Sequence, residues 1–239
     1  MPNRPANKPS ENFTLAVQVA RIDDLAEQLD GGNLSWLTEG ELARYEGMNS
    51  SPRKRQFLAG HYLVRKTAAN LFNNSPENWA YFQDEEALRR LKSDDGISPA
   101  LYISITHAGQ WIAAAISGEQ VGLDIETYEK ERDFIAIANH VFSVDEVRDL
   151  SFCGAGELKR RFYLYWTLKE AIGKRHGHGL KFEISRKQSP RTVAESELAN
   201  IYSWECPDYV LSLSSDASCG ITTLGLSANV IHKTWRNAI

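Results

Sequence analysis

The sequence predicts an α+β fold of two halves, each with several strands and at least one long helix. Segments that alternate apolar and polar residues indicate strands, because successive side chains of a strand point to opposite faces. Longer segments with apolar residues at helical spacing, opened by capping residues and followed by glycine, indicate helices. We expect a polar N-terminal arm over residues 1–12, one α+β half over residues 13–118 and a second over residues 119–239. Element order favours a duplicated architecture, although no sequence identity between the halves is evident.

The first half is expected to begin with a strand over residues 13–19. Residues 38–41 have the form of a capping box and predict the start of a helix. Ser51 followed by Pro52 predicts a second helix start, because proline is tolerated at the first helical position, and this helix extends to about Phe72. Its expected buried stripe is formed by Phe57, Leu58, Tyr62, Ala69 and Phe72.

Polar and charged residues over 73–98 indicate turns, and two strands are expected to follow over residues 101–105 and 111–116. The turn between these strands, residues 106–109, places His107 beside a hydroxyl group at the end of a strand. A lone histidine is more often a hydrogen-bonded structural residue than a catalyst. Position alone therefore favours a structural role for this side chain.

The second half is expected to begin with a strand over residues 121–126 and to continue with helices. Apolar residues at helical spacing follow Tyr128, and a capping box over residues 143–146 predicts another short helix. A long helix is expected over residues 157–176, with Gly177 at its end. The remaining strands are expected over residues 180–185, 202–205, 209–213 and 221–230, with a polar loop over residues 187–195.

Two acidic residues share one face of the strand that opens the second half. Asp124 and Glu126 are two positions apart, so they point to the same side, whereas the intervening positions are apolar. Neighbouring carboxylates repel each other unless a cation or a proton lies between them. Both residue types are poor strand formers, and such local exceptions tend to occur at functional positions. A metal or acid–base role is therefore favoured over an exposed acidic face, and Gly122 leaves room for a bulky neighbour.

The long helix carries a third acid and a base on one face. Glu170 and Lys174 are four residues apart, with Trp166 one turn earlier. Together with the strand carboxylates, these groups would complete an oxygen-ligand site suited to Mg²⁺ beside a phosphate. Taken alone, Lys169 and Glu170 are best explained as ordinary surface charge on a helix, and only the combined pattern favours a site.

Charge and composition exclude several classes of function. The net charge of −4 argues against a general nucleic-acid binder. The first long helix is nevertheless basic, which fits either a solvated face or an anchor for a phosphorylated ligand, and its basic residues are Arg53, Lys54, Arg55 and Arg65. No apolar run is long enough to span a bilayer, and the first dozen residues lack the apolar core of a signal peptide, so we expect a cytoplasmic protein. Cys153, Cys206 and Cys219 lack metal-ligand spacing and are expected to be unpaired thiols.

Two sequence blocks form a specific combined pattern. The first is Gly122-Leu-Asp-Ile-Glu126, and the second is Phe162-Tyr-Leu-Tyr-Trp-Thr-Leu-Lys-Glu-Ala-Ile-Gly-Lys174, followed by Gly177-His-Gly-Leu180. This pair resembles the signature of the Sfp-type 4'-phosphopantetheinyl transferases. Weaker similarities are found over residues 63–65, 105–108 and 141–146, and the whole resemblance extends over roughly residues 40–182.

The resemblance implies an enzyme that transfers 4'-phosphopantetheine from coenzyme A to a serine of an apo acyl or peptidyl carrier protein, releasing adenosine 3',5'-bisphosphate. It also implies a monomeric pseudo-dimer, in which two similar α+β halves hold the active site between them. Mg²⁺ is the implied cofactor, and neither nucleic acid nor a membrane is an implied partner. Carriers of fatty-acid, polyketide, polyunsaturated-lipid and peptide synthesis are all compatible with the sequence, which does not distinguish them.

The resemblance also assigns roles to the residues of the two blocks. Asp124, Glu126 and Glu170 are the implied Mg²⁺ ligands. Glu170 is further implied as the base for the carrier serine, directly or through water. Lys174 would lie close to the phosphates, where it would stabilise charge or protonate the departing adenosine bisphosphate.

Phosphate contacts are implied outside these blocks as well. His107 and Thr106 would contact a phosphate, and Arg65, with Arg53 or Arg55, would hold the 3'-phosphate as a charged fork. The implied catalytic set is Glu170, Lys174 and His107, and the implied coenzyme A set is Arg53, Arg55, Arg65, Thr106, His107, Asp124, Lys169 and Lys174.

The chain departs from the family pattern at two places. It has no Gly-Lys-Pro segment, and residues 84–92 occupy the corresponding region, where Arg89 and Arg90 are candidate replacements for the lysine. Thr106 stands where serine is usual, which keeps the hydroxyl group.

Two alternatives remain: a non-catalytic relative that binds only carrier proteins or nucleotides, and an unrelated Mg²⁺-dependent phosphohydrolase. The intact acids argue against the first, and the second does not explain the Trp-Thr-Leu-Lys-Glu helix.

Overall fold

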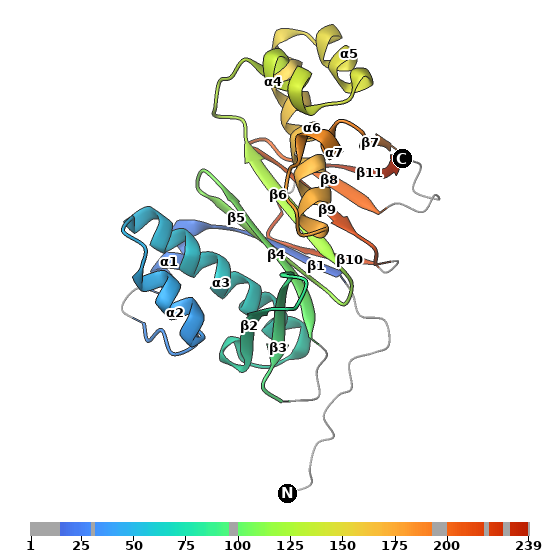
Figure 1. Ribbon diagram of the computed structural model, residues 1–239. Helices are drawn as coiled ribbons and strands as arrows, with labels where there is room; N and C mark the ends of the chain where they lie inside the picture. Colours follow the sequence, from blue (N-terminus) through green and yellow to red (C-terminus); the bar gives the residue numbers. More distant parts are fainter. Residues whose placement is uncertain are drawn as a thin grey trace, which may run out of the picture.

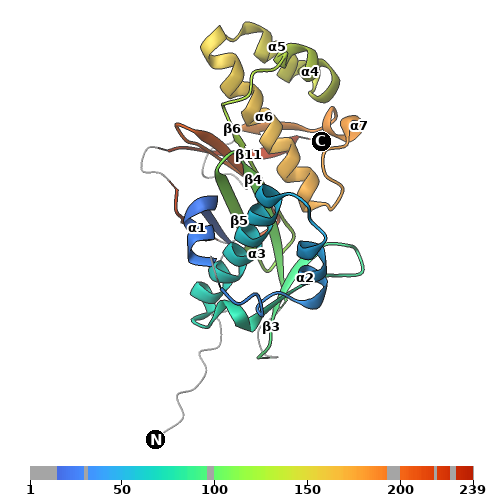
Figure 2. The ribbon, with the colours of Figure 1, turned by 90° about the vertical axis from the view of Figure 1, so that its left-hand side faces the viewer.

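The computed structural model describes residues 15–29, 32–95, 100–192, 200–217, 220–226 and 230–238. In these residues the chain forms two β-sheets, and a long helix packs on each of them (Figures 1 and 2). The prediction of an α+β fold is therefore confirmed. Within the same ranges, no helix combines the length and the apolar character that crossing a membrane requires.

The first sheet, over the part of the chain that the structure describes, has six strands in the order β10-β1-β5-β4-β3-β2. They are β1 (Leu15–Arg21), β2 (Trp79–Gln83), β3 (Arg89–Ser93), β4 (Leu101–Ala108), β5 (Trp111–Ser117) and β10 (Ile221–Leu224). β10 pairs in parallel with β1, whereas the other neighbouring strands pair antiparallel. A segment from late in the chain thus completes the early sheet.

The helical segments of this half are α1 (Ile22–Leu29), α2 (Glu39–Glu46), α3 (Ser51–Phe72) and the short 3-10 helix η1 (Pro76–Asn78). α2 begins with the expected capping box, in which the Glu41 backbone N–H donates to the Thr38 hydroxyl and the Thr38 backbone N–H donates to the Glu41 carboxylate. α3 is capped one residue earlier than expected, because the Ser50 hydroxyl accepts the Arg53 backbone N–H.

The buried face of α3 differs from the predicted stripe. Of the expected residues, Ala69 is buried and the other four are half-buried. Small and branched residues pack on the sheet instead, namely Ala59, Gly60, Leu63, Val64 and Ala68. A Cβ atom on Gly60 would lie 2.7 Å from Ile105 Cγ2, so the helix lies too close to the sheet for aromatic side chains to enter the contact.

The second sheet has five strands within the described ranges, in the order β6-β9-β8-β11-β7, and all neighbours pair antiparallel. They are β6 (Val121–Thr127), β7 (Ser189–Thr192), β8 (Ile201–Glu205), β9 (Tyr209–Ser215) and β11 (Ile231–Ala238). The helices of this half are α4 (Phe134–Val141), α5 (Val144–Phe152), α6 (Ala155–Arg175) and α7 (Phe182–Ser185). α6 packs along β6 and β9, and an aromatic cluster that includes Phe134, Phe142 and Phe162 joins it to α4.

Some segments differ from the sequence prediction. Residues 180–185, expected as a strand, contain the helical turn α7, because the backbone N–H groups of Ile184 and Ser185 donate to the Lys181 carbonyl. Of the strand expected over residues 221–230, only Ile221–Leu224 forms a strand, β10, and residues 227–229 lie outside the described ranges. The next strand, β11, begins at Ile231 and belongs to the other sheet. β3 and β7 form from charged or polar segments without apolar alternation, since their backbones pair with neighbouring strands.

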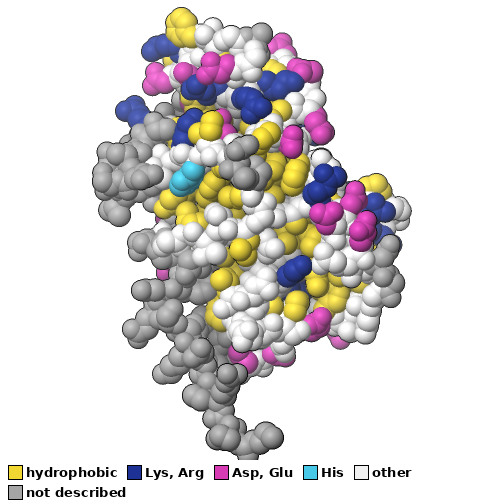
Figure 3. Space-filling model, turned by 180° about the vertical axis from the view of Figure 1, so that it is seen from behind, with side chains coloured by type: hydrophobic (Ala, Val, Ile, Leu, Met, Phe, Trp, Pro, Cys, Tyr) yellow, Lys and Arg dark blue, Asp and Glu magenta, His cyan; other side chains and the backbone are white. Residues whose placement is uncertain are grey.

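The two sheets pack against each other through an apolar cluster that includes Val17 and Ala115 from the first sheet and Leu123 and Leu213 from the second. Half-buried side chains such as Trp111 pack against this cluster. Figure 3 shows apolar side chains gathered on the rear face of the molecule. The interface between the sheets therefore forms part of the core that supports β6.

Two hydroxyl groups of β4 also join the sheets. Leu123 N–H donates to Ser104 Oγ at 2.9 Å, and Ile125 N–H donates to Thr106 Oγ1 at 3.4 Å. β6 is the edge strand of its sheet, so these hydroxyls satisfy backbone donors that no neighbouring strand reaches. β4 extends to Ala108, which corrects the expectation of a turn over residues 106–109.

Candidate active site

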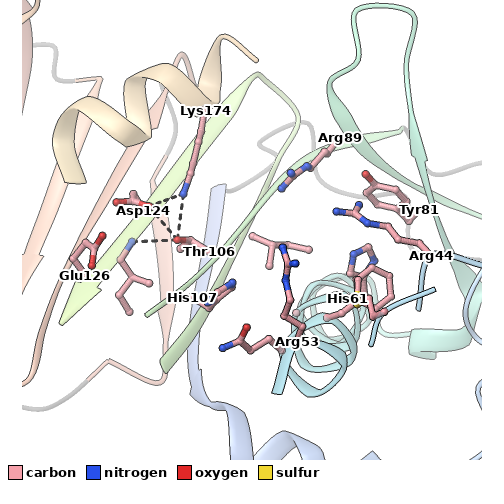
Figure 4. Close-up of a pocket in the computed structure, with 16 residues that line it drawn as sticks. Arg44, Arg53, His61, Tyr81, Arg89, Thr106, His107, Asp124, Glu126 and Lys174 are labelled. Atoms are coloured by element: carbon pink, nitrogen blue, oxygen red, sulfur yellow. Dashed lines mark hydrogen bonds and ion pairs between the residues drawn. The ribbon is translucent and has the colours of Figure 1, made fainter. Parts of the chain in front are cut away.

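A cavity of about 400 Å³ lies where α3, β4, β6 and the C-terminal end of α6 meet (Figure 4). We call it the main cavity. Its polar lining residues are Arg44, Arg53, Gln56, His61, Tyr81, Arg89, Thr106, His107, Asp124, Glu126 and Lys174. Carboxylates and a lysine gather at one end of the cavity and arginines at the other.

The acidic end is built around Asp124, whose side chain is buried on β6. Lys174 Nζ lies 2.5 Å from Asp124 Oδ1 and 3.3 Å from Thr106 Oγ1. The Thr106 hydroxyl donates to the same Asp124 oxygen at 3.1 Å. The structure thus brings Asp124, Lys174 and Thr106 together, and Glu126 lines the same cavity.

Gly122 explains how a residue of α6 reaches a residue of β6. A Cβ atom at this position would lie 2.0 Å from the Ala171 carbonyl oxygen and 2.4 Å from the Arg175 nitrogen, both in the backbone of α6. The bulky neighbour expected beside this glycine is therefore the helix itself. Because only hydrogen separates the two backbones, Lys174 approaches Asp124 closely.

The acidic end has features that suit a cation. Asp124 Oδ2 is buried and has no hydrogen-bond partner. Burial raises the pKa of Asp124, and burial together with the charge of Asp124 raises the pKa of Glu126. A hard divalent cation would pair with the free oxygen and relieve this repulsion.

Glu170 lies one helical turn before Lys174 and does not line the main cavity. It is half-buried together with Trp166 and Lys174, which places all three on one partly exposed face of α6. Burial and the charge of Asp124 raise the pKa of Glu170, so the carboxylates interact electrostatically. Among the described residues, no three His, Cys, Asp or Glu side chains are close enough to form a ready-made metal site. Asp124, Glu126 and Glu170 are close enough to interact electrostatically, but their side chains would have to move closer to one another to bind one cation together.

The opposite end of the main cavity is strongly positive. Arg44 of α2, Arg53 of α3 and Arg89 of β3 line it, and none of them forms an ion pair with an acidic side chain in the described residues. Partial burial and the positive charges of Lys174 and Arg53 lower the pKa of His107, which favours the neutral imidazole. Three guanidinium groups without acidic partners give this end of the cavity the chemistry that an anion such as phosphate requires.

The expectation that Arg65 holds a phosphate is wrong. Its side chain is fully buried, and its guanidinium donates to the Glu41 carboxylate, to the Trp79 carbonyl and to the His61 carbonyl. With these donors engaged, Arg65 fixes α3 to α2 and β2 and does not reach the cavity.

Two further residues of the predicted coenzyme set also lie elsewhere. Lys169 is buried, pairs with Glu146 at 2.9 Å and donates to the carbonyls of Ser185 and Gln188. Arg55 is exposed and pairs with Asp23 at 3.4 Å. Neither residue lines the main cavity, so both expectations are corrected.

The structure identifies residues that sequence reasoning missed or left open. Arg89 lines the main cavity, whereas Arg90 stacks on Tyr102 and pairs with Asp84. Of these two candidates, Arg89 is therefore the one that reaches the main cavity. Arg44 was missed altogether, because nothing in the sequence near it marks a site and only the packing of α2 against α3 brings it to the cavity.

Fold and site together define an α+β protein of two packed sheets, with one cavity that has carboxylates and a lysine at one end and unpaired arginines at the other. The family model of the 4'-phosphopantetheinyl transferase superfamily matches residues 120–214. A 4'-phosphopantetheinyl transferase of Bacillus subtilis is 28% identical over 127 residues, covering 53% of this chain and 54% of its own length. The gsp transferase of Aneurinibacillus migulanus is 27% identical over 190 residues, covering 73% of this chain and 76% of its own length. The resemblance to the 4'-phosphopantetheinyl transferase superfamily that the sequence predicted is confirmed by these matches.

The extent of these matches varies. AcpT of Escherichia coli K12 is 27% identical over 173 residues, which is 70% of this chain and 82% of that protein. This chain thus spans about half the length of the Bacillus subtilis relative and most of the other two. A solved holo-(acyl-carrier-protein) synthase from Bacillus anthracis, in complex with CoA (3',5'-ADP), matches 43% of this chain and 92% of its own, with 18% identity and a TM-score of 0.35.

Proposed function

We propose that this protein transfers the 4'-phosphopantetheine group of coenzyme A to a serine of an apo acyl or peptidyl carrier protein, with adenosine 3',5'-bisphosphate as the leaving group. The observation that carries the proposal is the division of the main cavity into an end with carboxylates and a lysine and an end with unpaired arginines. Coenzyme A has matching charge at two places, in its diphosphate and in its 3'-phosphate. The names of the relatives support the same activity.

The arginine end is proposed to hold the 3'-phosphate. Arg53 and Arg89 enter the cavity from different elements, so together with Arg44 they would surround a phosphate from several sides. Neutral His107 lies between the two ends and would contact a phosphate oxygen through a ring N–H. The diphosphate would then lie toward Lys174, whose ammonium group would stabilise the charge that develops on the leaving group.

Mg²⁺ is the proposed cofactor, held by Asp124 and Glu126 with Glu170 as the third carboxylate. The unpartnered oxygen of Asp124 and the mutual repulsion of the acids support this assignment. When bound, the ion would supply neutralisation of the diphosphate charge. Lys174 contacts the other Asp124 oxygen and would keep that carboxylate oriented.

Glu170 is also proposed to accept the proton of the carrier serine, directly or through water. Burial raises the pKa of this carboxylate, which makes it a stronger base than an exposed glutamate. Lys174 lies one turn along the same face of α6 and would donate a proton to the departing adenosine bisphosphate. We propose that the protein acts as a cytoplasmic monomer without a nucleic-acid or membrane partner; the net charge of −4 supports the absence of a nucleic-acid partner.

The test uses the purified chain with coenzyme A, Mg²⁺ and a panel of apo carrier proteins from fatty-acid, polyketide and peptide synthesis. Mass spectrometry should show a gain of one phosphopantetheine group on at least one carrier, and Asp124→Asn should reduce the rate by about 100-fold or more. Release of inorganic phosphate with unmodified carriers would support the phosphohydrolase instead. Binding of coenzyme A without transfer to any carrier would support a non-catalytic relative.

A further inference from the structure

Thr106 lies on β4 at the acidic end of the main cavity, and it is buried. Its hydroxyl oxygen lies 3.1 Å from Asp124 Oδ1 and 3.4 Å from the Ile125 backbone nitrogen, both on β6. Lys174 Nζ, on α6, lies 3.3 Å from the same oxygen (Figure 4). A single hydroxyl group thus connects β4, β6 and α6.

The chemistry of the three partners determines the direction of each hydrogen bond. A backbone N–H and an ammonium group can only donate, so Ile125 and Lys174 both donate to Thr106 Oγ1. The carboxylate of Asp124 is the acceptor that receives the hydroxyl hydrogen. A threonine hydroxyl has one hydrogen and two lone pairs, and all of them are used here. Since a phosphate oxygen is also an acceptor, Thr106 has no hydrogen left to donate to a phosphate.

The contacts of Asp124 are concentrated on one of its two oxygens. Thr106 and Lys174 both contact Oδ1, whereas Oδ2 has no hydrogen-bond partner among the described residues. The last torsion angle of an aspartate side chain is only broadly restricted, so the contacts to one oxygen determine where the other one lies. The partners of Oδ1 therefore set the direction in which Oδ2 points.

These two partners of Oδ1 differ in how firmly they are held. Lys174 has a long side chain that is 30% exposed, and the proposed function also requires its ammonium group beside the diphosphate. Thr106 is buried, its β-branched side chain has few rotamers, and its strand pairs with β5 along this segment. Thr106 would therefore keep its contact with Asp124 when Lys174 turns toward a phosphate.

We propose that Thr106 is a positioning residue of the cation site, whose hydroxyl group orients the Asp124 carboxylate for the metal ion. The inference rests on the proposed function, which assigns Asp124 to Mg²⁺. Residues that hold a metal ligand through a hydrogen bond contribute to metal affinity although they do not touch the metal. Thr106 thus acts on coenzyme A through the cation, and this differs from the phosphate contact that the family resemblance implies.

The test measures two affinities for each protein. Binding of coenzyme A in EDTA is measured by isothermal titration calorimetry, and binding of Mn²⁺ with coenzyme A present is measured by electron paramagnetic resonance. Thr106→Val removes the hydroxyl group and keeps the shape of the side chain. It should weaken Mn²⁺ binding by about tenfold or more and change metal-free coenzyme A binding by less than about twofold. Thr106→Ser keeps the hydroxyl group and should bind Mn²⁺ within about threefold of the unmodified protein.

Ser104→Ala is the matched control. Ser104 also lies on β4, and its hydroxyl group also accepts a backbone N–H of β6, from Leu123, but no hydrogen bond joins it to Asp124 in the described residues. Its loss should leave Mn²⁺ affinity unchanged, which separates the positioning of Asp124 from the joining of the two strands. Thr106→Ala removes the same hydroxyl group as Thr106→Val with a smaller side chain and should show the same selective loss, so the test does not depend on the folding of one variant.

Three results would overturn the assignment: unchanged Mn²⁺ affinity without the Thr106 hydroxyl group, an equal loss in Ser104→Ala, or a tenfold loss of metal-free coenzyme A binding in the Thr106 variants, which would indicate a direct phosphate contact. The proposed function fails in a different way. An unmodified protein that binds Mn²⁺ and coenzyme A but modifies no apo carrier would refute transfer, while a selective loss of Mn²⁺ affinity in Thr106→Val would still support the positioning role.

Discussion

Two arginines on α3 show how much depends on the direction of a single side chain. Arg53 lines the main cavity, whereas Arg55, two residues later, is exposed and pairs with Asp23. Arg53→Ala should weaken coenzyme A binding by about tenfold, because a charge-assisted contact to a phosphate is lost. Arg55→Ala should change it by less than about twofold. Titration of both variants with coenzyme A and with dephospho-coenzyme A provides the measurement, and an equal loss in the two variants would contradict the assignment.

At this scale the sequence identified charges but not their partners. Arg65 and Lys169 were expected at the coenzyme, yet each is buried against a glutamate. Glu41 and Glu146 belong to capping boxes that were recognised correctly, and their second role in a buried ion pair depends on how helices pack. Asp124 and Lys174 were predictable, because a short strand with two acids is unusual and the helix motif is specific.

The contact between α6 and β6 determines the shape of the acidic end of the main cavity. Gly122→Ala places a methyl group against the backbone of α6, so the helix has to move and we expect a loss of about 3 kcal/mol of stability. Activity should fall more than the loss of folded protein explains, because Lys174 moves with the helix. Gly156→Ala, in the first turn of the same helix with open space around it, is the control and should change stability by about 1 kcal/mol or less. Chemical denaturation and transfer rates test both variants.

The buried group that joins α2 to α3 should make stability depend on pH. Burial alone would raise the pKa of Glu41, but hydrogen bonds from His61 and Arg65 lower it from 4.5 to about 2. Because the pKa in the folded state is below that of the unfolded chain, this contribution is present above pH 4.5 and is lost as the pH falls toward 2. The lowered pKa of Glu41 corresponds to about 3 kcal/mol in the free energy of unfolding. The Glu41→Gln variant should therefore be less stable than the unmodified protein by roughly this amount at neutral pH.

Urea unfolding at a series of acidic pH values measures this effect. The unmodified protein should lose stability between pH 4.5 and 2 more steeply than Glu41→Gln. Parallel curves for the two proteins would show that the carboxylate is not stabilised by its partners.

At the scale of the molecule, the interface between the two sheets supports the strands that line the main cavity. Ser104→Ala removes the acceptor for the buried Leu123 N–H, and we expect a loss of about 1–3 kcal/mol of stability. Ser151→Ala on an exposed part of α5 is the control, with an expected change below about 0.5 kcal/mol. Thermal and urea unfolding measure the stability of the two variants. Similar unfolding curves would mean that the hydrogen bond to Ser104 does not stabilise the interface.

The architecture as a whole was predictable only in outline. Alternation and capping gave the α+β class and most strands and helices, since these signals are local. Sheet order was not predictable, because β10 pairs with β1 from more than 200 residues away. The charged segment that forms β3 showed no apolar alternation, yet it supplies Arg89 to the main cavity.

The parallel pairing of β10 with β1 has a consequence for dissecting the molecule. A fragment ending near residue 118 would lack the outermost strand of its own sheet and would expose the backbone donors and acceptors along β1 to other chains. Expressed alone, such a fragment should self-associate, and supplying the C-terminal fragment in trans should restore solubility. The halves are thus better regarded as mutually dependent folding partners than as separable modules.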